Sequence, residues 1–216
     1  MLNRLSSYRH LAEGLLRPAL SGLVLALTPF GARAHEFELG GDAYDDFLAG
    51  GEAVLNDLPV LLALMSTGIL VSLWNRQGLP RVWPAFLVSV LAGFVLAAAI
   101  PVDPVPVLYG AAIIAGLLAV AAVRGTRPVM AGIVFGAGLM TGWGILAGHG
   151  WGELPPGVYA GLFALFNLVL AASAAFSSAI LTRIPNHWTE IGLRALASWL
   201  TAIAIMSLAF VMGQAA

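Results

Sequence analysis

The chain of 216 residues has no cysteine and no lysine, and only 10% of its residues are charged. The lack of cysteine excludes disulfides, thiolate metal sites and thiol catalysis. Soluble domains carry charge on ~25% of their residues, whereas this chain is 60% hydrophobic with a mean hydropathy of +0.91. Because a short soluble fold cannot cover that much apolar surface, we predict a polytopic protein of the lipid bilayer.

The sequence also gives little indication of nucleic-acid binding, of hydrolytic catalysis or of haem binding. The formal net charge is −1, which gives no indication of a nucleic-acid partner. The sequence has no G-x-S-x-G or H-E-x-x-H motif. Its few histidines lie in predicted tails and loops, away from the facing helices that haem ligands need. We therefore expect neither an enzyme nor a resident cofactor.

The first 34 residues read as a secretory signal peptide. An apolar core, Ala19–Phe30, is too short to span a bilayer comfortably, and Ala32-Arg33-Ala34 is an A-x-A cleavage site. Basic residues precede the core at Arg4, Arg9 and Arg17. We predict cleavage, so that the mature chain begins at His35; an uncleaved signal anchor is the alternative.

Residues 35–52 form an acidic segment, which we interpret as a periplasmic arm. It carries six negative charges and no positive charge, at Glu36, Glu38, Asp42, Asp45, Asp46 and Glu52. The arm is either a solvated segment that helps to fix topology or a mouth that attracts cations, because clustered carboxylates concentrate counter-ions.

Residues 53–216 are predicted to form an all-α bundle of six transmembrane helices. Each apolar segment is long enough, at ~1.5 Å per residue, to cross a hydrocarbon core of ~30 Å. The connecting loops are short, so neighbouring helices should be antiparallel. The segments are 54–74, 84–102, 105–123, 129–148, 158–181 and 191–213.

The loops favour one orientation, with both mature termini in the periplasm of a bacterial inner (plasma) membrane. Loops 75–83, 124–128 and 182–190 carry the arginines and would be cytoplasmic, following the positive-inside rule. Every mature carboxylate except Glu190 falls on the opposite side.

Four residues are candidate metal ligands at the outer surface: His35, Asp57, His149 and Glu153. The imidazole and α-amine of His35 can chelate one cation, and nitrogen with carboxylate oxygen suits a divalent transition metal. Asp57 lies where the first span begins, which is costly unless the side chain faces water or the bundle interior. The simpler alternative for Asp57 is a helix N-cap.

Met130–Gly157 is rich in glycine and suggests a packing centre. Gly132/Gly136, Gly138/Gly142 and Gly144/Gly148 are small-xxx-small pairs, which let membrane helices approach closely. Such Gly/Ala-rich faces could also pack against a membrane-protein partner or a second copy. Asn167 is an amide in the middle of a predicted span, and an interhelical hydrogen bond is the favoured interpretation.

The order of these features resembles the HupE/UreJ family of small bacterial membrane proteins. The resemblance consists of the histidine after the cleavage site, Asp57 followed by an apolar run to Leu73-Trp74, the segment His149–Pro155, and Tyr159 opening the fifth span. It implies six helices and a nickel or cobalt permease, or an accessory protein beside hydrogenase and urease systems.

The sequence departs from the family pattern at two places. Leu58 stands where the family has a second histidine after the aspartate, and His149 is alone where the family has a histidine-rich segment. Two hypotheses follow: a permease or uptake accessory protein for nickel or cobalt as the transported ion, or a non-transporting subunit of a larger membrane complex.

Overall fold

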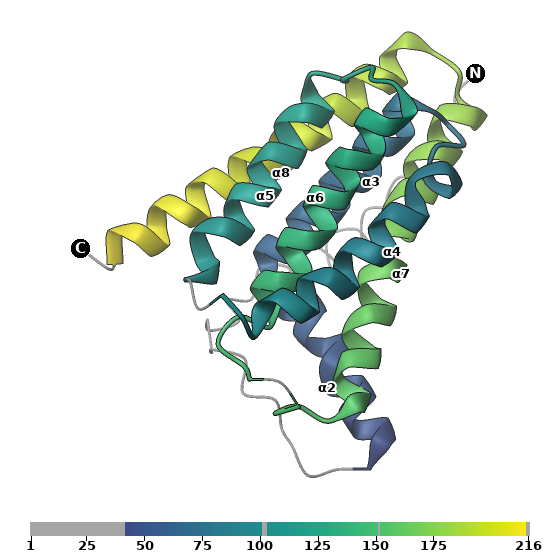
Figure 1. Cartoon of the computed structure of the whole chain (residues 1–216). Coiled ribbons are helices and arrows are strands. Elements are labelled where there is room, and N and C mark those ends of the chain that lie inside the picture. The colour runs from purple at the N-terminus through teal and green to yellow at the C-terminus, as the bar shows by residue number, and fades with distance from the viewer. Residues whose placement is uncertain (1–41, 101–102, 151, 215–216) are drawn as a thin grey trace, which may run out of the picture. The chain divides into compact units, whose positions relative to one another are not determined.

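A computed structural model describes residues 42–100, 103–150 and 152–214, all of them within the unit Phe37–Ala216 (Figure 1). These residues form helices and no strand, which confirms the all-helical prediction. The helices are α2 (Ala43–Asn56), α3 (Leu58–Trp74), α4 (Leu79–Ala97), α5 (Pro104–Val120), α6 (Arg127–Ile145), α7 (Pro156–Arg183) and α8 (His187–Gln214).

Helices α4, α6, α7 and α8 are long and apolar enough to cross a membrane. The pair α2 and α3 passes the same test together but is bent by 77°, and α5 is a shorter apolar helix of 17 residues. The described chain therefore has four helices of membrane-spanning length, or five if the bent pair forms one span. The six predicted segments overlap α3 to α8 in order, with boundaries that differ by several residues, and the first segment also includes the end of α2.

Helix α3 runs through the middle of the described helices and contacts each of the others (Figure 1). It is the most enclosed element, with 11 of its 17 residues buried. Its sequence has apolar residues on every side, which is the pattern of a helix without a solvated face. The central position predicted for residues 130–157 is therefore wrong, because α3 occupies it.

Glycines set the closest approaches between helices. A Cβ on Gly50 of α2 would collide with the Val158 carbonyl of α7, and a Cβ on Gly161 of α7 would collide with the Phe47 carbonyl of α2. Helices α4 and α6 also approach each other closely. A Cβ on Gly93 of α4 would lie 2.6 Å from the Leu139 carbonyl oxygen of α6. These pairs touch backbone to backbone, which side chains of any size would prevent.

The glycines of α6 divide into two groups. Gly138 and Gly142 face α4, where a Cβ on Gly142 would lie 2.8 Å from the Val90 oxygen. Gly132 and Gly136 have nothing within 4 Å of an added Cβ. Close packing is therefore confirmed for the pair Gly138/Gly142 and is wrong for Gly132/Gly136.

Polar side chains join α7 to its neighbours. Ser72 of α3 donates to the Ala174 carbonyl (2.8 Å), and Ser173 of α7 donates back to the Met65 carbonyl (2.8 Å). Trp83 Nε1 of α4 donates to Asn167 Oδ1 (2.8 Å). The interhelical hydrogen bond predicted for Asn167 is confirmed.

Two prolines shift the predicted boundaries. Pro84 was expected at the start of the second span, but α4 begins at Leu79 and has Pro84 inside its early turns. Pro59 lies in the first turn of α3, where its missing N–H costs little. Pro59 cannot donate to the carbonyl four residues earlier, which favours a break there, and the predicted helix beginning at residue 54 is divided at Asp57.

We expect Gly161→Ala to destabilise the protein and Gly132→Ala to leave it as stable or slightly more so. The Gly161 Cβ would displace the backbone of α2, at a cost of roughly 1–3 kcal/mol typical of overpacking. The Gly132 Cβ has open space. Thermal unfolding of the two variants in detergent micelles measures the difference, and equal melting temperatures would contradict the packing described.

Candidate functional site

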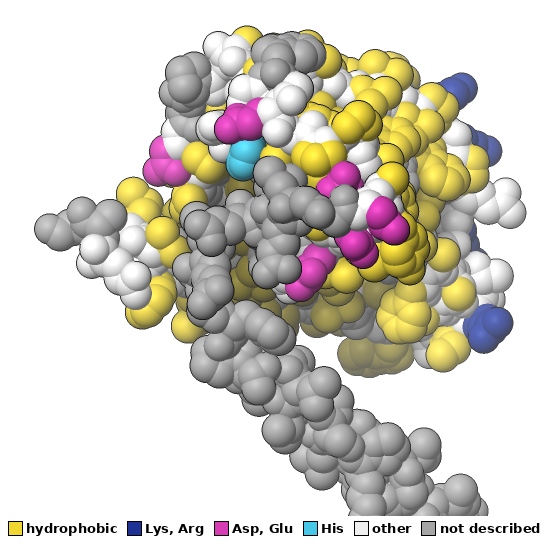
Figure 2. All heavy atoms as spheres, turned by 90° about the horizontal axis from the view of Figure 1, so that it is seen from below, with side chains coloured by type: hydrophobic (Ala, Val, Ile, Leu, Met, Phe, Trp, Pro, Cys, Tyr) yellow, Lys and Arg dark blue, Asp and Glu magenta, His cyan; other side chains and the backbone are white. Residues whose placement is uncertain are grey.

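Charged residues lie at opposite ends of the helices. We call the end formed by the starts of α2, α3, α5 and α7 the acidic end; its carboxylates are Asp42, Asp45, Asp46, Glu52, Asp57, Asp103 and Glu153. Figure 2 views this end and shows the acidic side chains and a histidine on it, with arginines only at the edge. The opposite, arginine end carries Arg76, Arg81, Arg124, Arg127, Arg183 and Arg194, together with Glu190.

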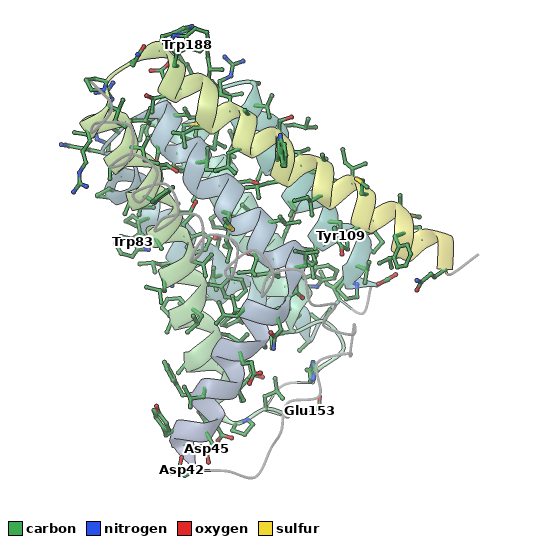
Figure 3. The ribbon with its side chains drawn as sticks, turned by 180° about the vertical axis from the view of Figure 1, so that it is seen from behind. Asp42, Asp45, Trp83, Tyr109, Glu153 and Trp188 are labelled. Carbon is green, nitrogen blue, oxygen red and sulfur yellow. The ribbon has the colours of Figure 1, made fainter. Side chains whose placement is uncertain are left out.

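Part of the acidic arm is helix α2, and two of its acids have a structural role. Asp42 caps the helix by accepting from the N–H groups of Tyr44 (2.9 Å) and Asp45 (3.0 Å). The Asp45 carboxylate accepts in return from the Asp42 N–H (3.3 Å), which completes a capping box. Both labelled residues lie at the tip of α2 in Figure 3. Helix α2 is held against α7 through the glycine contacts described above.

Asp57 lies at the break between α2 and α3. Its backbone is extended (φ −86°, ψ 97°), its N–H donates to Ala53 at the end of α2, and its Oδ1 accepts from the Val60 N–H (2.9 Å) at the start of α3. The helix-cap interpretation of Asp57 is therefore confirmed. A carboxylate oxygen has several lone pairs, so capping does not preclude a second role for this half-buried side chain.

One further polar side chain is buried near the acidic end. Tyr109, in the second turn of α5, has 7% of its surface exposed (Figure 3).

His149 and Glu153 lie in the loop between α6 and α7, as predicted. Gly148 (φ 93°) and Gly152 (φ 71°) adopt left-handed conformations, which favour glycine and end the helical path. Glu153 Oε2 accepts from the Gly150 N–H, and the Glu153 N–H donates to the Gly150 carbonyl (3.3 Å). The Glu153 carboxylate thus closes its own turn.

His149 borders an apolar cavity of about 300 Å³. The end of α4, the α6–α7 loop and Tyr159 of α7 form its walls, which include Leu91, Phe94, Val95 and Leu146. Phe94 packs against Tyr159 with ring centroids 6.1 Å apart. The surroundings of His149 are therefore mainly hydrocarbon.

Only three of the four predicted metal ligands belong to the residues that the structure describes. His35 lies outside the described residues. Within residues 42–100, 103–150 and 152–214, no three histidine, aspartate or glutamate side chains are close enough together to hold one metal ion. Shared metal binding by His35, Asp57, His149 and Glu153 stays a prediction.

Sequence reasoning did not single out Tyr109, although it is the one residue with a side-chain hydrogen-bonding group in the sequence of α5, PVPVLYGAAIIAGLLAV.

Comparisons with protein-family models, curated proteins and solved structures give no match.

Two substitutions of Asp57 distinguish the effect of its helix cap from the effect of its negative charge. Asparagine caps a helix about as well as aspartate, whereas alanine loses about 1 kcal/mol. We therefore expect Asp57→Asn to unfold near the wild-type temperature and Asp57→Ala to unfold several degrees lower in detergent. Asp103→Ala is the matched control, because Asp103 caps α5 through the Val105 N–H (3.1 Å). If Asp57→Ala is as stable as Asp57→Asn, the cap is not a stabilising element.

Proposed function

We propose that this protein is a HupE/UreJ-like integral membrane protein that takes up a divalent transition metal, nickel or cobalt, from the periplasm. The observation that carries the proposal is Asp57, a half-buried carboxylate at a break between two helices. Interrupted membrane helices are a recurrent way to build ion sites, because the break exposes backbone and helix ends to the ion.

The proposed orientation has the acidic end in the periplasm and the arginine end in the cytoplasm of the inner membrane. The positive-inside rule supports it, because the arginines gather at one set of loops. In this arrangement α3 to α8 are the six crossings after the cleaved signal peptide. Helix α2, bent by 77° from α3, lies at the outer surface.

Uptake would begin when the electric field of the acidic end attracts the cation. Clustered carboxylates raise the local cation concentration, with Asp46 and Glu52 of α2 adding charge at the same end as Asp57. His35, His149 and Glu153 would supply further ligands to the arriving metal, and imidazole nitrogen suits nickel and cobalt. Asp57 would receive the ion where α3 enters the bundle.

A second function has its own support: a non-transporting accessory subunit. The later part of α8 leaves large apolar side chains exposed, among them Met206 (72%) and Phe210 (69%). Lipid covers such a face in a monomer, and another membrane subunit covers it in a complex. The engagement of Glu153 in its own turn also fits a protein that binds no metal.

Metal uptake by cells expressing the protein tests the first function. We expect Asp57→Asn to lower nickel or cobalt uptake roughly tenfold or more, the scale on which losing a metal-site partner acts. Asp103→Asn, a second cap at the same end, should have a smaller effect because it changes only the surrounding field. Uptake equal to that of cells lacking the protein would exclude transport, and co-purification with a metal-free membrane complex would then support the accessory role.

Reporter fusions test the orientation and the number of crossings. A periplasmic reporter attached after Ala216 should be active, and one inserted in the loop at residues 121–126 should be inactive. The reverse pattern would invert the proposed topology, and activity at both points would mean that the number of crossings between them is even.

A further inference from the structure

The arginine end carries positive charge that the chain itself does not balance. Its six arginines are all exposed, and Glu190 is the one carboxylate among the described residues at this end. Within the described part of the chain, no ion pair joins these arginines to a carboxylate. Six guanidinium groups with a single carboxylate nearby form a surface that attracts anions.

Two of these arginines are joined where α4 and α6 begin. Arg127 is the first residue of α6, and its Nε donates to the carbonyl oxygen of Arg81, the third residue of α4 (3.3 Å). A guanidinium has five N–H groups, so this bond leaves the N–H groups of both Nη atoms for another acceptor. Arg124 stands three residues before Arg127, in the connection between α5 and α6. The side chains of three arginines thus start from one small region.

The exposed face of α4 continues from Arg81 as a strip of hydrocarbon. Residues three and four apart in a helix lie on one face. With that spacing, every residue that follows Arg81 as far as the end of α4 is exposed: Pro84, Val88 (60%), Leu91 (51%) and Val95 (50%). At ~1.5 Å per residue, the apolar strip extends about 21 Å from the arginine. The face therefore has the polarity of a phospholipid, with a polar head and an apolar length.

We propose that Arg81 and Arg127, with Arg124 beside them, bind the phosphate of an anionic phospholipid whose acyl chain lies along the exposed face of α4. The inference requires a bilayer around the protein, but it does not require metal transport. Arginine suits this partner because its planar guanidinium can donate two parallel hydrogen bonds to phosphate oxygens. The whole chain lacks lysine, so every permanent cation at this end has that geometry.

The depth of these arginines favours a lipid over an acidic protein or a free phosphate ion. Arg81 and Arg127 belong to the first turns of apolar helices and not to a projecting loop. Trp74 of α3 holds the connection between α5 and α6 by donating to the Gly125 carbonyl (2.7 Å). Tryptophan concentrates at the depth of lipid headgroups, and Trp188 is 73% exposed at this end (Figure 3). The guanidinium groups would therefore lie level with lipid phosphates.

The simpler role of the arginines is to fix the orientation of the helices during insertion. That role depends on how many positive charges lie on one side of the membrane. It predicts that removing any two arginines of this end has the same effect on lipid binding. Arg76 and Arg183 provide the comparison, because both are exposed at the same end. They belong to the side of α3 and α7, where Ser178 donates to the Arg76 carbonyl.

The test uses the full chain, purified in a non-ionic detergent and titrated with phosphatidylglycerol, with bound lipid measured by native mass spectrometry. We expect Arg81→Gln with Arg127→Gln to weaken binding roughly thirtyfold, since each basic residue near anionic lipid contributes a factor of about five. Arg76→Gln with Arg183→Gln removes the same charge and should weaken binding by no more than about fivefold, through the screened field alone. Equal losses in the two pairs would overturn the inference.

A lysine pair separates positive charge from guanidinium geometry. Arg81→Lys with Arg127→Lys keeps both charges but cannot form the paired hydrogen bonds, so its affinity for phosphatidylglycerol should lie between those of the wild type and the glutamine pair. Thermal unfolding shows whether each variant is folded. If the glutamine pair does not fold, the lysine pair decides the question, and an affinity equal to that of the wild type would overturn the inference.

Three other probes identify the kind of anion that binds. Inorganic phosphate, phosphatidylcholine and polyglutamate represent a free phosphate ion, a phospholipid without net charge and an acidic protein. We expect phosphatidylglycerol to bind more tightly than all three. Binding of any of them that is as tight and depends on Arg81 and Arg127 would overturn the choice of an anionic lipid. Lipid binding by a protein without metal uptake would preserve this inference and overturn only the proposed function.

Discussion

The structure depends on direct contact between helix backbones at positions without a side chain. Inside a bilayer, lipid tails are as apolar as leucine, so burial of hydrocarbon does not by itself bring helices together. Dispersion forces and interhelical hydrogen bonds do so, and both require close approach. Gly50 of α2 and Gly161 of α7 each lie against the backbone of the other helix, and Gly93 of α4 and Gly142 of α6 do the same, which provides that approach. The serine bonds between α3 and α7 then become short enough to form.

These contacts also explain why α3 is enclosed. Helix α7 lies against both α2 and α3, and α4 lies against α6, so the close pairs surround the same central helix. A mainly apolar helix suits that centre, although Ser66 of α3 is buried there with its hydroxyl unpartnered. Polar side chains make hydrogen bonds at its two ends. Asp57 accepts from the Val60 N–H at one end, and Trp74 donates to the Gly125 carbonyl (2.7 Å) at the other.

The apolar runs predicted α3 to α8, whereas the helix α2 within the acidic segment, and its separation from α3, were not predicted. The prediction that the α6–α7 segment is a loop followed from Gly150 and Gly152, whose flexibility opposes a helix. What could not be predicted was which helix lies at the centre. Glycine spacing is the same on a face that meets a neighbour and on one that meets lipid, as Gly138 and Gly132 show. Only the arrangement of all the helices distinguishes the two.

The sequence identified candidate site residues from their local position in the chain, but it could not predict which of them lie close together in space. Asp57 could be singled out because an acid opening an apolar run is unusual, and its cap role followed from the same position. The side chains that lie near Asp57 in space could not be predicted, because the intervening stretches give no indication of which helix ends meet. Charge segregation between the two ends was predictable, since it needs only alternating helix directions.

The unequal lengths of the helices have a consequence for the surrounding lipid. At ~1.5 Å per residue, the 17 residues of α5 extend about 25 Å, whereas the 28 residues of α7 and of α8 extend about 42 Å. A hydrocarbon core of ~30 Å accommodates the long helices by tilting them, and in the proposed six-span arrangement it would thin beside the short one. In that arrangement membrane thickness acts on this protein most strongly at α5. A thicker bilayer would draw the ends of that helix further from water.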